Sequence, residues 1–356
     1  MTSIIDLARC LGSPLLPGAG LQDLRESDDL LELAFRNRIE LIYLSNLEQA
    51  GLLKRLRPQW EEYQQRCEKT LECIVRIATA MEDQQIPYAI TKSLRPYPAI
   101  PNDTDLLYLG PLNDYPEALE RFERAGFVLS HNGDMQAEFF DPRGGEAFNR
   151  DKRGGKFYID FYRQLAADRV PYISSNVLRQ HVITRNIGGT PVKVFDPIAE
   201  MTILYLHSVI MHRTIPLEVL WCSAYWLSGL DNDCLADFPI FIRNNRARTA
   251  AATVFGLMSE LHREAYGQTP AVLTTLTSKV GLRQVELQEW RHNENAFPHV
   301  VRLSTFALAL LEKMGEANSL KGFANQLLDM LHPSKAVEVM HHLLDKAQIQ
   351  RHSTHV

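Results

Sequence analysis

Two aspartates stand at the start of an apolar run, in a pattern that could bind a cation. Residues 91–110 read TKSLRPYPAIPNDTDLLYLG, with Asp103 and Asp105 separated by one threonine. Alternate side chains of a strand point to the same face, which places the two carboxylates about 6.6 Å apart at about 3.3 Å per residue. Two like charges at that distance need a cation. The pair therefore predicts a cation site at the beginning of a buried strand.

A third carboxylate follows in the segment KFYIDFY, where Asp160 alternates with the apolar positions of a predicted strand. Magnesium prefers hard oxygen ligands and is usually shared between one or two carboxylates and substrate phosphates. Two Mg²⁺ or Mn²⁺ ions would activate an attacking hydroxyl and stabilise a departing pyrophosphate. We predict that Asp103, Asp105 and Asp160 bind the metal and carry the reaction. Glu138 or Asp141 could take the place of Asp160, and a solvated aspartate pair is the simplest alternative.

Positive and small residues precede and follow these carboxylates. Lys92 and Ser93 end the first predicted strand, where a hydroxyl, backbone N–H groups and an ammonium could hold a triphosphate. The segment from 141 to 163, DPRGGEAFNRDKRGGKFYIDFYR, contains two Gly-Gly pairs, with Arg153 just before and Lys156 just after the second. We predict that these two side chains contact the nucleotide or an anionic acceptor. A solvated basic hairpin is the alternative.

The spacing of these residues resembles the nucleotidyltransferase signature of the DNA polymerase beta superfamily. That signature has a small-residue turn, a spacer, a D-x-D/E pair and a third acid on a later strand. More narrowly, the chain is similar to an uncharacterised nucleotidyltransferase family with the order Lys-Gly, Tyr-Pro and Asp-Ile-Asp-Leu-Leu. The matching positions are Lys92, Tyr97, Pro98, Asp103, Asp105, Leu106 and Leu107. The resemblance implies a minimal nucleotidyltransferase domain, an NTP as substrate and Mg²⁺ or Mn²⁺ as cofactor.

Some positions differ from that family. Ser93 stands where the family has Gly, and Thr104 replaces an apolar residue between the aspartates. The family also carries histidines on a following helix, to which LYLHSVIMHR is similar. His207 and His212 are five residues apart, an advance of about 500°, or about 140° net, on an α-helix. We therefore expect the two rings on different faces, without a joint metal site, and predict His212 at the nucleotide pocket; a core or surface histidine is the alternative.

The elements that must position these residues fall into three predicted regions. Residues 1–85 read as helical, with one helix from the N-cap Ser27 to Gly51 and another over 58–85. Residues 86–196 alternate strands, turns and one helix at 114–126, and form the expected nucleotidyltransferase domain. The expected strands are 88–91, 104–109, 127–130, 137–140 and 157–162, with a hairpin turning at Gly188 and Gly189. Residues 197–356 read as helical again.

Composition narrows the class of protein. The chain has 356 residues, is 45% hydrophobic and carries a net charge of -5, which disfavours a nucleic-acid coat. No apolar run approaches the roughly 20 residues of a membrane helix, so we expect a cytoplasmic protein with no membrane partner. We interpret its five scattered cysteines as reduced, buried thiols.

The sequence thus predicts an α+β protein in which a mixed-sheet nucleotidyltransferase domain is flanked by helical regions. The predicted reaction is metal-dependent transfer of a nucleoside monophosphate from an NTP, such as ATP, to an unknown hydroxyl or phosphate acceptor. A small molecule or a protein is favoured over RNA as acceptor. Two other classes stay open: an inactive scaffold that binds nucleotide, and an interaction protein that recognises a partner through its helices. The oligomeric state is not predicted.

Overall fold

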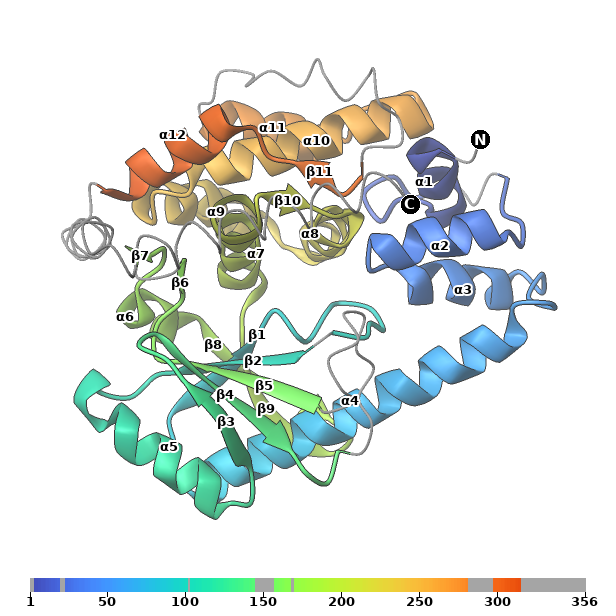
Figure 1. Ribbon diagram of the computed structural model, residues 1–356. Helices are drawn as coiled ribbons and strands as arrows, with labels where there is room; N and C mark the ends of the chain where they lie inside the picture. Colours follow the sequence, from blue (N-terminus) through green and yellow to red (C-terminus); the bar gives the residue numbers. More distant parts are fainter. Residues whose placement is uncertain are drawn as a thin grey trace, which may run out of the picture.

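The computed structural model describes residues 3–19, 23–101, 103–144, 157–167, 170–280 and 297–314. Within these residues a seven-stranded mixed sheet has the order β3-β4-β5-β2-β1-β9-β8 (Figure 1). Its strands are β1 (Tyr88–Thr91), β2 (Asp103–Tyr108), β3 (Val128–Asn132), β4 (Gln136–Asp141), β5 (Phe157–Tyr162), β8 (Val182–Ile187) and β9 (Thr190–Phe195). The central strands β2 and β5 run parallel, whereas β1 and β2 run antiparallel. Short ladders join β6 (Ala166–Ala167) to β7 (Val170–Pro171), and β10 (Thr214–Ile215) to β11 (His299–Val300).

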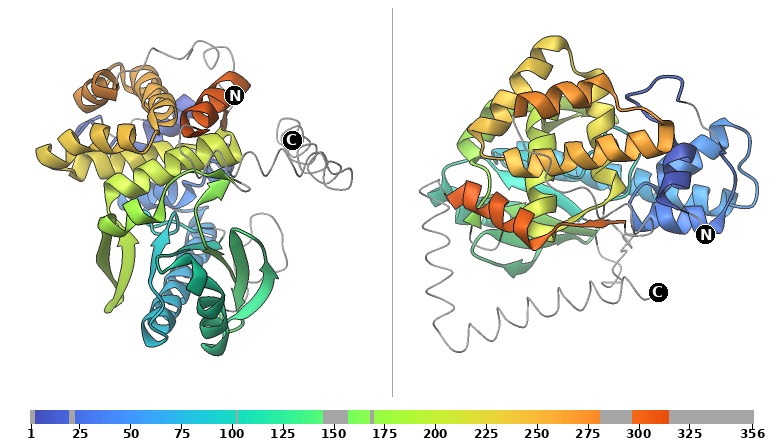
Figure 2. Two further views of the ribbon diagram at one scale, coloured as in Figure 1. Left: turned by 90° about the vertical axis from the view of Figure 1, so that its left-hand side faces the viewer. Right: turned by 90° about the horizontal axis from the view of Figure 1, so that it is seen from above.

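Helices cover both faces of the sheet (Figure 1). The described helices are α1 (Ile4–Leu11), α2 (Asp28–Arg36), α3 (Glu40–Gln49), α4 (Arg57–Asp83), α5 (Tyr115–Arg124), α6 (Ser175–Leu178), α7 (Pro197–Leu206), α8 (Leu217–Gly229), α9 (Asn232–Asn244), α10 (Arg248–Tyr266), α11 (Ala271–Val280) and α12 (Leu303–Met314). The side view in Figure 2 shows the sheet with α4 and α5 in one half and the later helices in the other. No described helix combines the length and apolar character needed to cross a lipid bilayer.

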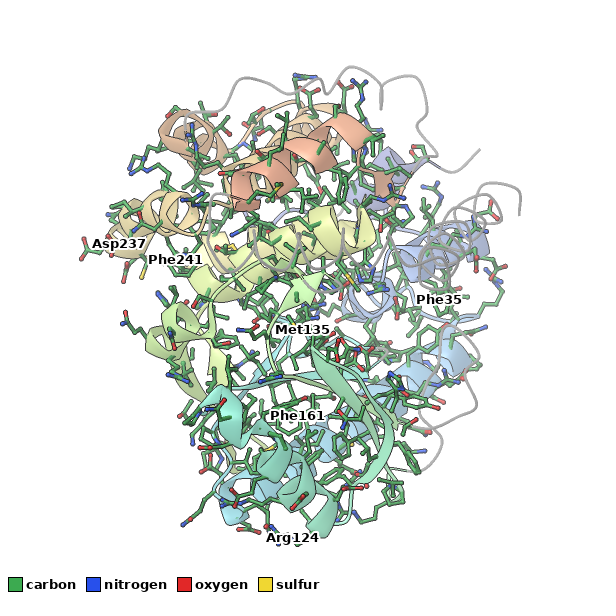
Figure 3. All side chains as sticks on the ribbon, turned by 60° about the vertical axis from the view of Figure 1, so that its left-hand side comes forward. Phe35, Arg124, Met135, Phe161, Asp237 and Phe241 are labelled. Atoms are coloured by element: carbon green, nitrogen blue, oxygen red, sulfur yellow. The ribbon has the colours of Figure 1, made fainter. Side chains whose placement is uncertain are left out.

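One face of the sheet forms an apolar core with α4 and α5. Leu106 and Phe161 point to this face and are fully buried there. The Phe161 ring centroid lies 5.6 Å from that of Phe122 on α5, and Figure 3 shows Phe161 in the half of the molecule that holds this core. Because side chains alternate along a strand, residues 103, 105 and 160 must point to the opposite face.

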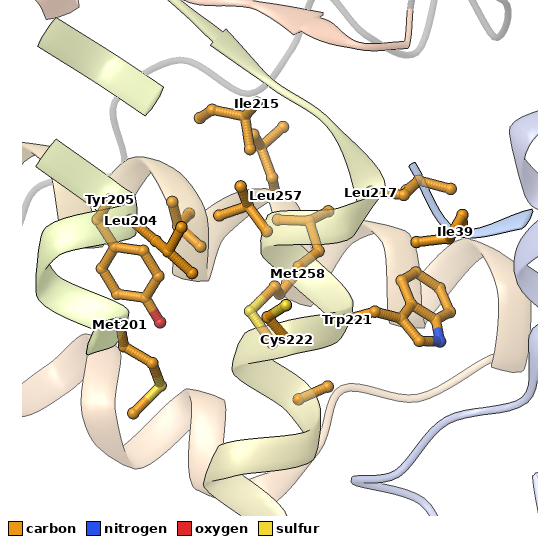
Figure 4. Packing of buried hydrophobic residues seen from close by; sticks show 14 of the residues in the cluster. Ile39, Met201, Leu204, Tyr205, Ile215, Leu217, Trp221, Cys222, Leu257 and Met258 are labelled. Atoms are coloured by element: carbon orange, nitrogen blue, oxygen red, sulfur yellow. The ribbon is translucent and has the colours of Figure 1, made fainter. Parts of the chain in front are cut away.

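That opposite face meets the helical half of the molecule. Leu107 and Tyr162, which alternate with the core-facing residues, belong to a second apolar cluster together with α1–α3 and α7–α12. Figure 4 shows Ile39, from the N-terminal part, near Leu217 and Trp221 of α8. The first and last helical parts of the described chain therefore share one core, above the carboxylate-bearing face of the sheet.

The strand predictions are confirmed to within one or two residues, including the hairpin at Gly188 and Gly189. The single helix expected from Ser27 to Gly51 is wrong. The chain breaks between α2 and α3, where Arg38 adopts a left-handed φ of 59°. The break is stabilised by tertiary hydrogen bonds, because the Asn37 side-chain oxygen accepts from the Leu217 amide at 3.2 Å. A contact between residues 180 positions apart cannot be read from local periodicity.

The cysteine prediction is confirmed in part. All five thiols are free, but Cys67 and Cys234 are only partly buried. The part of the expected helical region 197–356 that follows residue 314 lies outside the described residues.

Candidate active site

The three predicted carboxylates lie on one face of the sheet, at the junction of β2 and β5. Asp105 is the direct parallel partner of Asp160, and Asp103 pairs with Tyr158. Asp105 is buried, while Asp103 and Asp160 are partly exposed. The parallel pairing of β2 with β5 thus brings Asp160 beside the D-x-D pair, although the two segments are separated by β3 and β4 in sequence.

The cation that this cluster requires is present as a side chain. Lys92 Nζ lies 2.7 Å from Asp105 Oδ1, and the two side chains are only 4% and 11% exposed. The same ammonium lies 4.7 Å from the centroid of the Tyr162 ring, and Tyr162 donates a hydrogen bond of 3.2 Å to Asp160 Oδ2. Lys92 was predicted to hold a triphosphate, but in this structure its ammonium binds a carboxylate and is enclosed.

One ammonium does not neutralise three carboxylates. Burial, followed by repulsion from Asp105 and Asp160, raises the pKa of Asp103 to about 8. Burial and the charge of Asp105 raise the pKa of Asp160 to about 6. Ionising all three carboxylates beside one ammonium is therefore unfavourable, and a further cation would favour their charged forms.

The turn that carries Lys92 and Ser93 is anchored by hydrogen bonds on both sides. Ser93 Oγ accepts from the Asp105 amide at 2.9 Å and donates to the Thr91 carbonyl at 3.0 Å. Thr91 Oγ1 donates to Glu200 Oε2 at 2.9 Å, and the Lys92 amide donates to the other oxygen of Glu200. The Ser93 hydroxyl is thus engaged in joining the turn to β2, and its predicted contact with phosphate stays a prediction.

A second buried ion pair continues the network away from the sheet. Arg95 Nε lies 2.8 Å from Glu218 Oε1 on α8, and both side chains are almost fully buried. Arg38 Nη1 lies 3.8 Å from the other oxygen of Glu218 and is 42% exposed. The positive charge of Arg38 also lowers the pKa of Asp103, after the larger effects that raise it. Arg38 therefore brings a partly exposed cation from the N-terminal part to the carboxylates.

The sequence reasoning missed Arg38, Arg95, Glu200 and Glu218. A signal existed for the two acids, since each is a lone carboxylate in an otherwise apolar helix, PIAEMTILYL and LEVLWCSAYW. A charge on a fully buried helix needs a partner and therefore indicates a polar network. No comparable local signal marks Arg38, because its position depends on the packing of α2 and α3 against α8.

The two histidines were expected on different helix faces, and this expectation is wrong. Their ring centroids are 4.4 Å apart with nearly perpendicular planes. The segment His207–His212 is π-helical, and in a π-helix residues five apart follow one another by about one turn. His207 Nδ1 also lies 3.2 Å from the Tyr172 hydroxyl, and burial, with the nearby charge of Lys92, lowers the pKa of His207 well below its ordinary value. His212 thus lies against His207; its contact with nucleotide stays a prediction.

The remaining candidates fall into two groups: residues that already have ion-pair or hydrogen-bond partners, and residues that lie outside the described part of the chain. Asp141 is held by Arg76 at 2.8 Å and by Arg143 at 3.2 Å, and so it does not compete with Asp160. Glu138 is the antiparallel partner of Asp160 and accepts a hydrogen bond of 3.0 Å from Ser130. The predicted nucleotide contacts Arg153 and Lys156 lie outside the described residues.

The three aspartates offer carboxylate oxygens, the ligand type that Mg²⁺ prefers. In the described part of the chain, however, no group of three or more His, Cys, Asp or Glu side chains is arranged so that it could hold a metal ion by itself. Magnesium needs only one or two protein carboxylates when substrate phosphates complete its shell. A cavity of about 300 Å³ lies nearby, lined by residues that include Leu94, Glu200 and Trp226 but none of the three aspartates.

Comparison with known proteins adds little to this geometry. The sequence matches no protein-family profile, and no curated protein is detectably similar to it. One similar solved structure is an antigenic nucleotidyltransferase-like protein from Paracoccidioides brasiliensis, with 14% identity, a TM-score of 0.32 and coverage of 57% of this chain and 95% of that chain. A TM-score this low does not establish a common fold, so the likeness supports no statement about function. The family resemblance of residues 91–107 therefore remains a prediction.

Proposed function

We propose that this chain is a metal-dependent nucleotidyltransferase with a polymerase beta-like catalytic domain. It would move a nucleoside monophosphate from an NTP to a hydroxyl or phosphate acceptor. The observation that supports this proposal most is the pairing of Asp105 with Asp160 on neighbouring parallel strands, with Asp103 on the same face. The anchored turn at Lys92 and Ser93 beside this face gives the proposal its second support.

The roles of the carboxylates follow from their positions. Asp103 and Asp105 would hold Mg²⁺ or Mn²⁺, with Asp160 completing the ligand set. When bound, the ion supplies charge stabilisation at the phosphoryl oxygens and at the leaving pyrophosphate. Asp160 would also accept the proton of the acceptor, as a carboxylate placed beside the attacking hydroxyl can do. Tyr162 orients it by donating to its Oδ2.

The positive side chains would bind the triphosphate. Lys92 and Arg38 both approach the carboxylates, one from the sheet and one from the N-terminal helices. Phosphate oxygens are better partners for a partly exposed guanidinium than a carboxylate 3.8 Å away. His212, Arg153 and Lys156 remain proposed nucleotide contacts.

A second candidate function is a nucleotidyltransferase-like scaffold without turnover. It is favoured by one observation, the buried ion pair of Lys92 with Asp105, which neutralises part of the carboxylate cluster without any metal. A scaffold of this kind would not bind divalent cations strongly and would not turn over NTP. The third class, an interaction protein, would need an apolar surface on the last helices. Leu303, Leu308 and Leu311 of α12 are exposed, but the chain after residue 314 lies outside the described residues, so this surface supports no proposal.

Label transfer tests the proposed function directly. Each of the four NTPs, labelled at the α-phosphate, is incubated with fractionated host lysate, the protein and Mg²⁺ or Mn²⁺. The matched control is an Asp103→Asn/Asp105→Asn variant, which retains side-chain size and is checked for folding by circular dichroism. We expect label in one fraction only with the wild-type protein, and that fraction identifies the acceptor as small molecule, protein or RNA. The same experiment identifies the preferred nucleotide.

Two other outcomes are informative. If no nucleotide labels any fraction and the wild-type protein shows no metal-dependent NTP binding, the enzyme proposal is wrong and the scaffold is favoured. If label appears equally with the double variant, the three carboxylates are not the site of the reaction.

A further inference from the structure

The ammonium of Lys92 lies in a buried position whose neighbours favour a cation. Asp105 contacts it on one side at 2.7 Å, and the Tyr162 ring covers it with a centroid distance of 4.7 Å. Only 4% of the Lys92 side chain is exposed. Lysine is almost never buried this completely unless a partner compensates its charge. The pair with Asp105 is therefore the interaction that keeps Lys92 inside.

The backbone shows that Lys92 is held in this position. Its φ of 55° is in the left-handed region, which costs a non-glycine residue about 1–2 kcal/mol. The Lys92 amide donates a hydrogen bond to a Glu200 oxygen. The next residue of the turn, Ser93, accepts a hydrogen bond from the Asp105 amide of β2. Tertiary hydrogen bonds thus stabilise an unfavourable conformation that directs the side chain toward Asp105.

An ammonium and a divalent cation that both lie against the Asp105 carboxylate would repel each other. Charges about 4 Å apart in a partly buried site repel by about 4 kcal/mol per unit product of charge, and a divalent ion doubles that repulsion. We propose that Lys92 is an internal counter-ion that a divalent cation must displace from Asp105. In the metal-free protein Lys92 then stays buried against Asp105 and compensates its charge. This inference rests on the metal site of the proposed function.

Displacement would also give Lys92 its second role. Once Asp105 binds the metal, the ammonium moves away from the Tyr162 ring and becomes accessible to solvent on the same face of the sheet. Substrate phosphates would bind there, so the displaced ammonium would be available to them. The two interpretations of Lys92, carboxylate partner and triphosphate contact, then describe the same residue before and after the metal binds.

Direct measurement of Mn²⁺ binding tests the displacement. Free Mn²⁺ is followed by electron paramagnetic resonance with the full-length wild-type protein and the Lys92→Met and Lys92→Arg variants. Lys92→Met removes the competing charge but retains an apolar chain, so we expect a dissociation constant at least about tenfold lower than that of the wild type. Lys92→Arg keeps the charge and should bind Mn²⁺ about as the wild type does. The matched control is Lys193→Met, which removes a lysine that pairs with Glu82 at the surface.

A second measurement on the wild-type protein does not depend on any variant folding. Amine acetylation, read by mass spectrometry, reports the accessibility of each lysine. We expect saturating Mg²⁺ to raise the acetylation rate of Lys92 several-fold, because its amine leaves the buried position beside Asp105 and becomes exposed to the reagent. The rate at Lys193, which is already 40% exposed, should not change.

The outcomes separate this inference from the proposed function. Equal or weaker Mn²⁺ binding by Lys92→Met, with clear binding by the wild type, overturns the displacement while leaving the metal site in place. Unchanged acetylation of Lys92 at saturating Mg²⁺ overturns it as well. Absence of Mn²⁺ binding in every variant rejects the metal site itself and, with it, both proposals.

Discussion

At the scale of single residues, Thr104 shows how two faces of one strand differ. Its neighbours Asp103 and Asp105 point to the polar face, whereas Thr104 is fully buried on the apolar one. Its hydroxyl finds no hydrogen-bond partner among the described residues. An unpaired buried hydroxyl costs about 1–3 kcal/mol. The hydroxyl of Thr104 therefore does not stabilise the folded protein.

We predict that Thr104→Val stabilises the protein by about 1 kcal/mol, because valine has the same shape without the unpaired hydroxyl. Thr91→Val is the matched comparison. It removes the 2.9 Å hydrogen bond to Glu200, and should destabilise the protein by about 1–3 kcal/mol. Urea unfolding of both variants measures the free energies. Equal effects at the two positions would contradict the different roles assigned to the two hydroxyls.

Arg38 is the residue whose role depends most on the proposed function. We predict that Arg38→Ala weakens binding of a Mg²⁺–NTP complex about tenfold, because one charge-assisted contact to phosphate is lost. Titration of a fluorescent nucleotide analogue measures the affinity. Arg36→Ala is the control, since Arg36 pairs with Glu32 at the surface. Unchanged affinity in the Arg38 variant would mean that this guanidinium serves only Glu218.

At the scale of elements, the break between α2 and α3 joins the N-terminal helices to α8. Asn37 is fully buried, and its carbonyl and side-chain oxygens accept from the first two amides of α8 at 3.1 and 3.2 Å. These amides have no partner within their own helix, and the residue before α8, Pro216, provides no side-chain cap. Asn37 thus caps α8 from a distant part of the sequence and places Arg38 beside Glu218.

We predict that Asn37→Ala lowers the free energy of unfolding by about 1–2 kcal/mol, as the loss of a helix cap does. Nucleotide binding should weaken too, because Arg38 follows in the same turn. Thermal or urea unfolding measures the first effect. Asn244→Ala, at an exposed position in the last turn of α9, should change stability by less than about 0.5 kcal/mol. A loss of the same size in both variants would reject the capping role.

The π-helical segment after α7 is the other element whose geometry affects the site. One additional residue per turn places His212 against His207, where an α-helix would separate them. Segments of this kind frequently occur at functional sites. The segment packs against α12 and β10, contacts that local periodicity does not reveal.

At the scale of the whole molecule, two buried groups, Asp103 and His262, give opposite dependences of the free energy of unfolding on pH. Asp103 has a raised pKa, about 8, so the native state keeps a proton that the unfolded state loses above its ordinary pKa near 4. Its contribution to stability is therefore lost as the pH rises from about 4 to 8. Burial lowers the pKa of His262, so below about pH 6.5 the unfolded state binds a proton that the native state does not.

We predict that Asp103→Asn is more stable than the wild type by about 1–3 kcal/mol at pH 8 and gains little at pH 4, because the amide carries no charge to bury. His262→Gln should behave in the opposite sense. It should flatten the loss of stability below about pH 6.5 and leave the slope above it unchanged. Urea unfolding at a series of pH values measures both curves. A pH-independent effect of Asp103→Asn would show that its carboxylate is not repelled by its neighbours.

The sequence by itself determined the strands, the face shared by Asp103 and Asp105, and the mid-strand position of Asp160. Alternation of two residues per strand and apolar spacing are local rules, and they suffice for these statements. The tertiary structure decided which strand lies beside which, and so placed Asp160 against Asp105 through the β2–β5 pairing. It also decided that the neutralising cation is Lys92 and that Arg38, Glu200 and Glu218 join the site. These contacts connect distant positions, and they persist because attraction and hydrogen bonds between paired groups offset the cost of burying their charges, which one sequence read locally does not express.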